Sequence, residues 1–263
     1  MEKAYKNLDF LSSRDARTLR ILSEYLEPQS RFGHYRVTDT VVFFGSARAL
    51  PADEASSKLE KALAEKDEPK IEASRRSVTL ARYYEDARTL ARLLTEWSKS
   101  LELPDRRFIV CSGGGPGIME AANRGASEAS GISIGLGISL PCEPTANRFI
   151  TRELGFEFHY FFMRKFWFVY LAKALVVFPG GFGTMDELFE LLTLIQTRKT
   201  GKKMPVVLYG AEFWNDVLDL DALVRWGTIS REDLGLFHVS SDPDEAFEFL
   251  RASLDRLYLQ PGE

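Results

Sequence analysis

A short stretch of the sequence, FPGGFGTMDELFE at residues 178–190, combines bare backbone with carboxylates. Its chemically relevant residues are Gly180, Gly181, Gly183, Thr184 and Glu187. Glycine leaves no side chain in the way of an anion that approaches backbone amides. The threonine hydroxyl can donate to that anion or cap the helix that it opens. The pattern therefore predicts an anion site followed, one helical turn later, by a carboxylate.

A second glycine-rich junction, VCSGGGPGIMEAANRG at residues 110–125, has the same strand-to-helix setting. Its glycines are Gly113, Gly114, Gly115 and Gly117. A P-loop needs Lys and then Ser or Thr after its last glycine, and the sixth position of a GxGxxG pattern is Ile118 here, so neither common phosphate signature fits. One such turn alone is equally well explained as a tight strand-to-helix connection. Two in the same sheet favour a phosphate-binding site.

Composition limits the kind of partner. The 263 residues are 45% hydrophobic and 27% charged, which suits one large α/β domain, with two domains as the alternative. A net charge of -4 and a pI near 5.6 argue against a surface built for nucleic acid or membrane. Cys111 and Cys142 have no CxxC motif and no histidine cluster nearby, so we expect reduced thiols and no metal site. Without a signal-peptide core or an apolar run near the ~20 residues of a membrane span, we expect a cytoplasmic protein.

Apolar spacing predicts alternating strands and helices. An amphipathic helix is expected over residues 7–28, ended by Pro28, within an N-terminal helical extension of residues 1–36. The charged segment 51–75 is expected to form a solvated helical excursion, and the tail a helix begun by Asp242 or Pro243. Further helices are predicted at 78–97, 117–130, 163–173 and 184–197, and strands within 40–48, stopped by Gly45, and at 107–113, 132–138, 174–178 and 204–210.

These strands are apolar almost throughout, as strands buried on both faces are. With the helices between them they predict a single α/β domain over residues 1–263, a doubly wound, mostly parallel, Rossmann-like sheet with helices on both faces. In such a sheet, ligands bind beyond the carboxyl ends of the strands, where helix N-termini favour negative charge. Both glycine junctions are expected at that edge.

The motifs resemble one known family. The residues SGGGPGIMEAANRGA, the pair Arg164 and Lys165 after an aromatic run, and PGGFGTMDE are similar to the LOG family. This is the cytokinin-activating type of nucleoside 5′-monophosphate phosphoribohydrolase, whose members are often labelled lysine decarboxylases. The resemblance covers residues 38–250, and the N-terminal segment is similar to the extension of longer bacterial members. The charged segment 51–75 and Glu120, where compact members tend to have glycine, depart from the family pattern.

The resemblance implies hydrolysis of the N-glycosidic bond of a nucleoside 5′-monophosphate, with AMP or a cytokinin riboside monophosphate as substrate. Breaking this bond develops positive charge on the ribose, which a carboxylate beside C1′ can stabilise. We expect Glu187 to be that carboxylate and the phosphate to bind the amides from Gly180 to Thr184. Asp186 is offset by about 100° around the helix, so it should face elsewhere and only complement the helix dipole.

Other site residues follow from the family, or from their place at the same edge of the sheet. Arg164 is expected as a catalytic residue whose guanidinium holds Glu187 ionised or binds substrate oxygens. Without the family match it would as readily be a solvated charge. The remaining candidates for substrate binding are Lys165, Gly114, Gly115, Ser46 and Arg48 after the first strand, and Asn147 and Arg148, which resemble the family's Pro-x-x-Asn segment. The dispersed histidines, expected to be structural or surface residues, are His34, His159 and His238.

One other function stays open at this point, and the label of lysine decarboxylase is not supported by the residues. A non-catalytic nucleotide or molybdopterin carrier can use the same sheet and loops, although an intact pair of Arg164 and Glu187 favours the enzyme. A lysine decarboxylase needs a lysine that binds pyridoxal phosphate. Neither Lys165 at a helix start nor Lys173 on an apolar helix face offers one. No metal or redox cofactor is implied.

The aromatic stretch FEFHYFFMRKFWFVYLAKA, residues 156–174, carries more large rings than one helix can turn toward its own sheet. Such an excess commonly covers a partner's surface. We therefore predict a homodimer or higher homo-oligomer with this region at or beside the interface. A wholly internal core helix is the alternative.

Overall fold

One sheet organises the molecule. In the computed structural model, which describes residues 2–139 and 146–260, seven strands lie in the order β4-β3-β2-β1-β5-β6-β7. Every neighbouring pair is parallel. The strands are β1 (Thr40–Phe44), β2 (Ile109–Ser112), β3 (Ser133–Ile138), β4 (Gly155–Phe158), β5 (Ala172–Val177), β6 (Val206–Tyr209) and β7 (His238–Ser240). The predicted α/β fold is confirmed, and the described sheet is wholly rather than mostly parallel.

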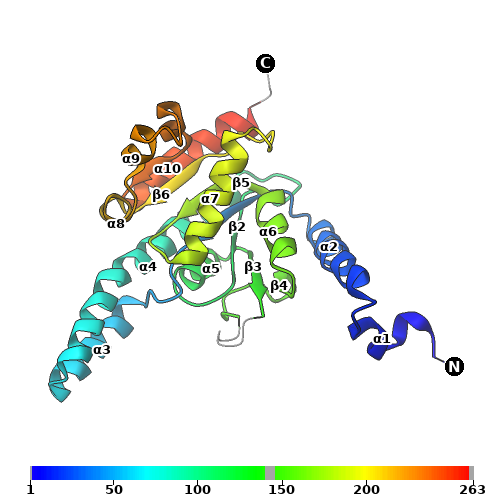
Figure 1. Cartoon of the computed structure of the whole chain (residues 1–263), viewed down its shortest axis with the longest axis horizontal. Helices are drawn as coiled ribbons and strands as arrows, with labels where there is room; N and C mark the ends of the chain where they lie inside the picture. The colour runs from blue at the N-terminus through cyan, green and yellow to red at the C-terminus, as the bar shows by residue number, and fades with distance from the viewer. Residues whose placement is uncertain (1, 140–145, 261–263) are drawn as a thin grey trace.

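Helices cover both faces of this sheet (Figure 1). Side chains alternate along β1, so that Val42 and Phe44 join one core cluster and Val41 and Phe43 join the other. The first cluster lies under α2 (Arg17–His34), α6 (Phe161–Tyr170), α7 (Phe182–Gln196) and α8 (Ala211–Val217), and the second under α4 (Glu68–Ser100), α5 (Ile118–Glu128) and α10 (Pro243–Leu254). The remaining helices and helical turns are α1 (Leu8–Ser12), α3 (Ala52–Glu65), α9 (Leu220–Arg225), Ala4–Lys6, Arg152–Leu154, Arg231–Leu236 and Asp255–Leu259.

The charged segment after β1 is an antiparallel pair of helices. α3 packs against the first half of α4, and together they extend away from the sheet, in cyan in Figure 1. Ala55, Ala62 and Ile71 are buried in this pair, while its outer surface is charged. The sequence predicted separate helices at 51–75 and 78–97. In the structure both ranges overlap α4, a single helix of 33 residues that begins in the charged segment and continues onto the sheet.

Pro28 does not end the first long helix, contrary to the sequence prediction. α2 begins at Arg17 rather than near residue 7 and continues past Pro28 to His34. Proline has no N–H, so the carbonyl of Glu24, four residues earlier, loses its helical donor. That carbonyl instead accepts a hydrogen bond of 2.9 Å from the indole Nε1 of Trp167, and Pro28 itself is buried. A tertiary contact thus replaces the local bond whose loss normally ends a helix.

Two further predictions were wrong in detail. The helix predicted over 163–173 ends at Tyr170, and Lys173 lies in β5 rather than on a helix face. The edge strands β4 and β7 were not predicted at all. They are four and three residues long, and their mixed burial differs from the continuously buried central strands, so local patterns gave little signal for them.

Candidate active site

The two central strands meet where the direction of winding reverses. From β1 the chain crosses through α3 and α4 to β2 on one side, and from β5 it crosses through α7 to β6 on the other. The segments leaving these two strands are joined by hydrogen bonds from Phe178 N to Phe44 O, 2.8 Å, and from Ser46 N to Pro179 O, 2.9 Å. Open α/β sheets bind ligands at such a switch point. The loop from Gly180 to Thr184 begins there.

The N-terminus of α7 is open to an anion. Gly181 occupies its N-cap position, no side chain caps it, and its first turn contains no acidic residue. The first amides of a helix have no acceptor within the helix and carry partial positive charge. Nothing lies within 4 Å of a β-carbon built at Gly181 or Gly183, so no described residue packs against these two glycines on that side. Thr184 is not the cap that the sequence suggested, because it lies in the first turn and is buried.

Gly180 has a different role from its neighbours. A β-carbon at this position would lie 2.1 Å from Oγ1 of Thr184, which is closer than atoms can pack. We expect Gly180→Ala to lower the free energy of unfolding by about 1–3 kcal/mol, as overpacking does. Gly183→Ala, which meets open space in a helix, should be neutral or stabilise by about 0.5–1 kcal/mol. Urea titrations of both variants measure this, and equal stabilities would contradict the close contact between Gly180 and Thr184.

The first glycine loop is less available to an anion. The N–H of Ile118, the first residue of α5, already donates to the carbonyl of Ser46 at 3.1 Å, and Glu120 places a carboxylate in that helix's first turn. Gly114 and Gly117 have positive φ, and a β-carbon on Gly117 would lie 2.2 Å from Ser46 O. These glycines let the loop pack against the segment after β1. Ser46 therefore contacts both glycine loops through its backbone.

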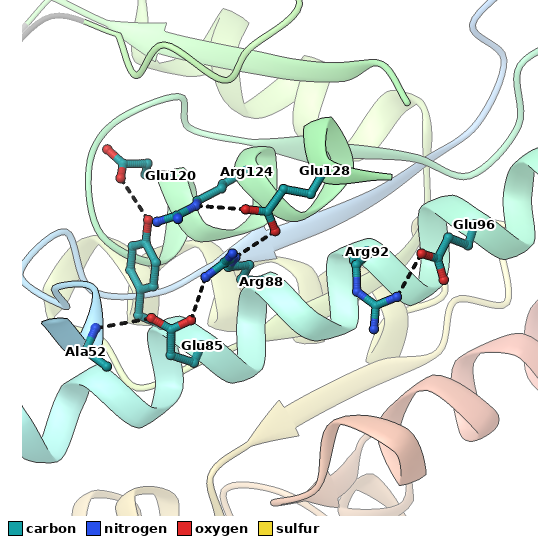
Figure 2. Close-up of polar contacts among 9 residues, drawn as sticks. Ala52, Glu85, Arg88, Arg92, Glu96, Glu120, Arg124 and Glu128 are labelled. Atoms are coloured by element: carbon teal, nitrogen blue, oxygen red, sulfur yellow. Dashed lines mark hydrogen bonds and ion pairs between the residues drawn. The ribbon is translucent and has the colours of Figure 1, made fainter. Parts of the chain in front are cut away.

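Glu120 belongs to a network of polar contacts between α4 and α5 (Figure 2). It accepts a hydrogen bond of 2.8 Å from the hydroxyl of buried Tyr84, and burial raises the pKa of that phenol. Figure 2 shows the network continuing from Arg124 through Glu128 to Arg88 and Glu85. Glu85 also accepts from the N–H of Ala52, the first residue of α3. The network joins α5 to the base of the helix pair that projects from the sheet.

Asn147 holds the first glycine loop in place through hydrogen bonds to its backbone. Its side-chain amide donates to the carbonyls of Gly114 and Gly115 and to Oδ1 of Asn123, each at 3.0 Å. Asn123 in turn accepts from the hydroxyl of Ser112, which accepts from Gly114 N. We did not single out Ser112 and Asn123 from the sequence, although polar residues inside the VCSGG and AANRG segments are the signal that could have found them. Cys142, in the segment just before Asn147, lies outside the described residues.

Glu187 and Arg164 come together from different helices. Glu187 on α7 is 6% exposed and lies 3.6 Å from the guanidinium of Arg164 on α6, which is 17% exposed. Burial raises the pKa of the Glu187 carboxyl, and the positive charges of Lys165 and Arg164 oppose that rise. The guanidinium lies near the rings of Phe161 and Phe168, and its buried Nε has no hydrogen-bond partner among the described residues. A buried carboxylate with a cation beside it is suited to stabilising positive charge that develops on a bound molecule.

Lys165 and Asp186 form a separate ion pair on the outer side of these helices. The Lys165 ammonium lies 2.7 Å from Asp186 and 2.6 Å from Glu190. Burial alone would lower the pKa of Lys165, but its hydrogen bonds to these two carboxylates raise it overall. Asp186 is 59% exposed, so it faces away from Glu187, as the helical offset predicts. Lys165 is next to the site, with its ammonium turned toward this surface pair.

Several other ionisable residues are exposed, or are held by partners outside the pair of Glu187 and Arg164. Lys173 is in β5 and pairs with buried Asp39 at 3.3 Å, at the amino end of the strands and so opposite the glycine loops. His34 and His159 are exposed, and His238 bonds Glu245. Cys111 is a free, buried thiol whose pKa is raised by burial. Arg48 and Arg148 are both exposed, and Arg48 donates its backbone N–H to the hydroxyl of Ser46.

A cavity of about 250 Å³ also lies far from the glycine loops. It is at the amino end of β2 and β3 and is lined by residues that include Lys99, Arg106 and Arg107. Open α/β sheets bind ligands at the carboxyl end of their strands, which is the opposite end, so we do not assign the chemistry to this cavity. Within residues 2–139 and 146–260, no group of histidine, cysteine and acidic residues is arranged to hold a metal ion. No described helix is long and apolar enough to cross a membrane.

The fold and site define a Rossmann-like protein with two glycine-rich loops at the carboxyl edge of a parallel sheet, one of them at the switch point. A family model described as possible lysine decarboxylase matches residues 119–250, which is half of the chain. The chain belongs to this family, the LOG family that its motifs resemble. None of the curated proteins compared with the chain matches it.

Solved structures with a similar arrangement have low sequence identity. The X-ray structure of TM1055, a structural genomics target, is 20% identical over 81% of this chain and 99% of its own, with a TM-score of 0.49. Two structures of the molybdenum cofactor carrier protein from Chlamydomonas reinhardtii are 19% and 18% identical. They cover 84% and 82% of this chain and 99% and 98% of their own, with TM-scores of 0.47 and 0.45.

Proposed function

We propose that this protein hydrolyses the N-glycosidic bond of nucleoside 5′-monophosphates to the free base and ribose 5-phosphate. The observation that supports this most is the buried carboxylate of Glu187, held 3.6 Å from Arg164 just below the open N-terminus of α7. The phosphate binds at that N-terminus, on the amides from Gly180 to Thr184. The sugar then lies toward Glu187, which is one helical turn further along.

The chemistry follows from this placement. As the bond between C1′ and the base nitrogen breaks, its electron pair leaves with the base and positive charge builds on the ribose. The Glu187 carboxylate stabilises that charge and orients a water molecule, whose oxygen bonds to C1′ while one of its protons ends on the base. Arg164 keeps Glu187 ionised against the effect of burial or holds a hydroxyl of the sugar.

The remaining candidates have supporting roles in this proposal. Ser46 follows β1 and bonds the segment that leads into the second glycine loop, and the exposed side chain of Arg48 is assigned to the phosphate. Gly114 and Gly115 form the neighbouring wall, and Asn147 binds ligand only indirectly, through the loop that it fastens. Lys165 contributes positive potential rather than a direct contact, because Asp186 and Glu190 hold its ammonium. We also propose a cytoplasmic location, where the free thiol of Cys111 stays reduced.

A panel of nucleoside monophosphates tests the reaction directly. Purified protein is incubated with AMP, GMP, CMP, UMP and cytokinin riboside monophosphates, and the products are separated by chromatography. Release of base together with ribose 5-phosphate supports the enzyme and identifies the preferred base. Tight binding without turnover would instead support the alternative, a non-catalytic nucleotide or molybdopterin carrier. Release of CO2 from lysine would overturn both.

We also propose that the protein is a homodimer through α6 and α7. Phe161, Phe162, Phe166 and Tyr170 on α6 are each at least one-third exposed, so this helix is not wholly internal within one chain. Phe182 in the glycine loop is 96% exposed, and Phe189 adds to the same surface of α7. Burial of these rings against a second copy would remove a large apolar area from water.

Light scattering at micromolar concentration should therefore give the mass of a dimer. Phe162→Asp should shift the mass toward the monomer because it places a charge inside the interface. Trp226→Asp is the matched control, since Trp226 is 84% exposed but lies after α9, outside this surface. A monomer mass for the parent protein would exclude the dimer.

A further inference from the structure

Helix α2 holds α6 immediately before the turn that carries Arg164. The two carboxylate oxygens of Glu24 accept hydrogen bonds from His159 N at 2.8 Å and Tyr160 N at 3.2 Å. Tyr160 is the N-cap residue of α6, and no side chain of its own caps that helix. Glu24 therefore holds the two backbone N–H groups that directly precede α6, and the N–H of Tyr160 is the one from which a capping-box side chain within the helix would otherwise accept.

A second contact from the same residue lies one turn beyond Arg164. The carbonyl of Glu24, which Pro28 leaves without a helical donor, accepts from the indole of Trp167 at 2.9 Å. The Trp167 ring lies against Tyr25 and Phe32 of α2, with centroid distances of 5.7 Å and 5.3 Å. Trp167 is buried, so this contact is part of the core. α6 is thus fixed to α2 on both sides of Arg164.

We infer that Glu24 is a positioning residue, which sets the place and rotation of α6 and so keeps Arg164 beside Glu187. This inference rests on the proposed function for the catalytic meaning of that pair, but the positioning itself does not. α2 lies outside residues 119–250, the part matched to the family. The N-terminal extension then completes the active site rather than merely preceding it.

The charge around Glu187 gives a readout that a purely structural role would not change. The charges that act on it are those of Lys165 and Arg164 on α6, which lower its pKa, and those of Glu190 and Asp186 on α7, which raise it. Burial raises the pKa of Glu187 and the two cations oppose this, so a displaced α6 lets that pKa rise further. The carboxylate is ionised only above its pKa. If activity needs the ionised carboxylate, the variant loses activity on acidification at a higher pH than the parent protein does.

The test compares Glu24→Ala with Glu24→Gln and Glu27→Ala. Glu27 lies one turn further along α2 and pairs with Arg31, without contact to α6 among the described residues, so it is a matched control. For Glu24→Ala we expect kcat to fall about tenfold and the acidic limb of the kcat/KM profile to move up by about one pH unit. Glu24→Gln keeps one acceptor oxygen and should be intermediate. Glu27→Ala should match the parent.

Two further measurements separate the possible failures. In an Arg164→Ala background, Glu24→Ala should shift the acidic limb by less than in the parent, because one of the two cations that α6 positions is gone and only Lys165 remains. The titration of Glu187 can also be followed by carbon-13 NMR, assigned with Glu187→Gln, without any turnover. A shifted titration in Glu24→Ala with no hydrolysis by the parent protein would support the positioning and reject the proposed reaction. An unshifted titration in a folded Glu24→Ala protein would overturn the positioning, whatever the activity.

Discussion

Glu187→Gln should lower kcat by roughly 100-fold or more, as loss of other preorganised electrostatic contacts does. The substitution keeps the size of the side chain and removes its charge. The carboxylate is 6% exposed and lies beside Arg164, so little water can replace it in stabilising positive charge on the sugar. The substitution leaves the proposed phosphate site at the start of α7 unchanged, so binding of the nucleoside monophosphate should survive. Steady-state kinetics and calorimetric binding measure the two effects separately.

Asp186→Asn is the internal control for this experiment. Asp186 is the neighbouring residue on the same helix, but it is mostly exposed and pairs with Lys165 instead of Arg164. Glu190 still holds the Lys165 ammonium after the substitution, so kcat should change by much less than for Glu187→Gln. A Glu187→Gln protein that folds, binds the nucleotide and hydrolyses it at the parent rate would remove Glu187 from the mechanism and reject most of the case for this reaction.

Removal of the 5′-phosphate from the substrate should have an effect of similar size. A phosphate at the N-terminus of α7 accepts hydrogen bonds from amides that have no other acceptor in the helix. Hydrogen bonds to a charged group contribute about 1.5–3 kcal/mol each, so two of them correspond to a loss of about 100-fold or more in kcat/KM. Adenosine should therefore be hydrolysed at least this much less efficiently than AMP.

A competition experiment distinguishes phosphate binding from general recognition of the sugar. Ribose 5-phosphate should inhibit hydrolysis of the nucleoside monophosphate, whereas ribose at the same concentration should not. Equal kcat/KM values for adenosine and AMP, or equal inhibition by the two sugars, would rule out a phosphate site on the amides from Gly180 to Thr184. Such a result would leave the assignment of Glu187 to be judged on its own variant.

Much of the frame of this site can be predicted from the sequence because it depends on short-range patterns. Continuous apolar runs located the five central strands, since strands buried on both faces lose their polar positions. The glycine-rich junctions after two of them were visible as bare backbone between a strand and a helix. The helical offset between Asp186 and Glu187 separated an exposed from a buried carboxylate without any knowledge of neighbours.

Only the tertiary structure decided how these parts work together. The sequence could not show that Asn147 fastens a loop or that Thr184 is buried inside a turn, because these contacts join distant segments or depend on close packing. The two glycine loops look alike as sequence, but one helix has its first amide bonded to Ser46 and the other is open. Pro28 stays within a helix because Trp167, 139 residues further along the chain, bonds the carbonyl that proline leaves free. Local sequence determines which residues can form an element, since its free energy depends on near neighbours. The contacts between elements decide which helix N-termini stay open to a ligand and which charged side chains pair with each other.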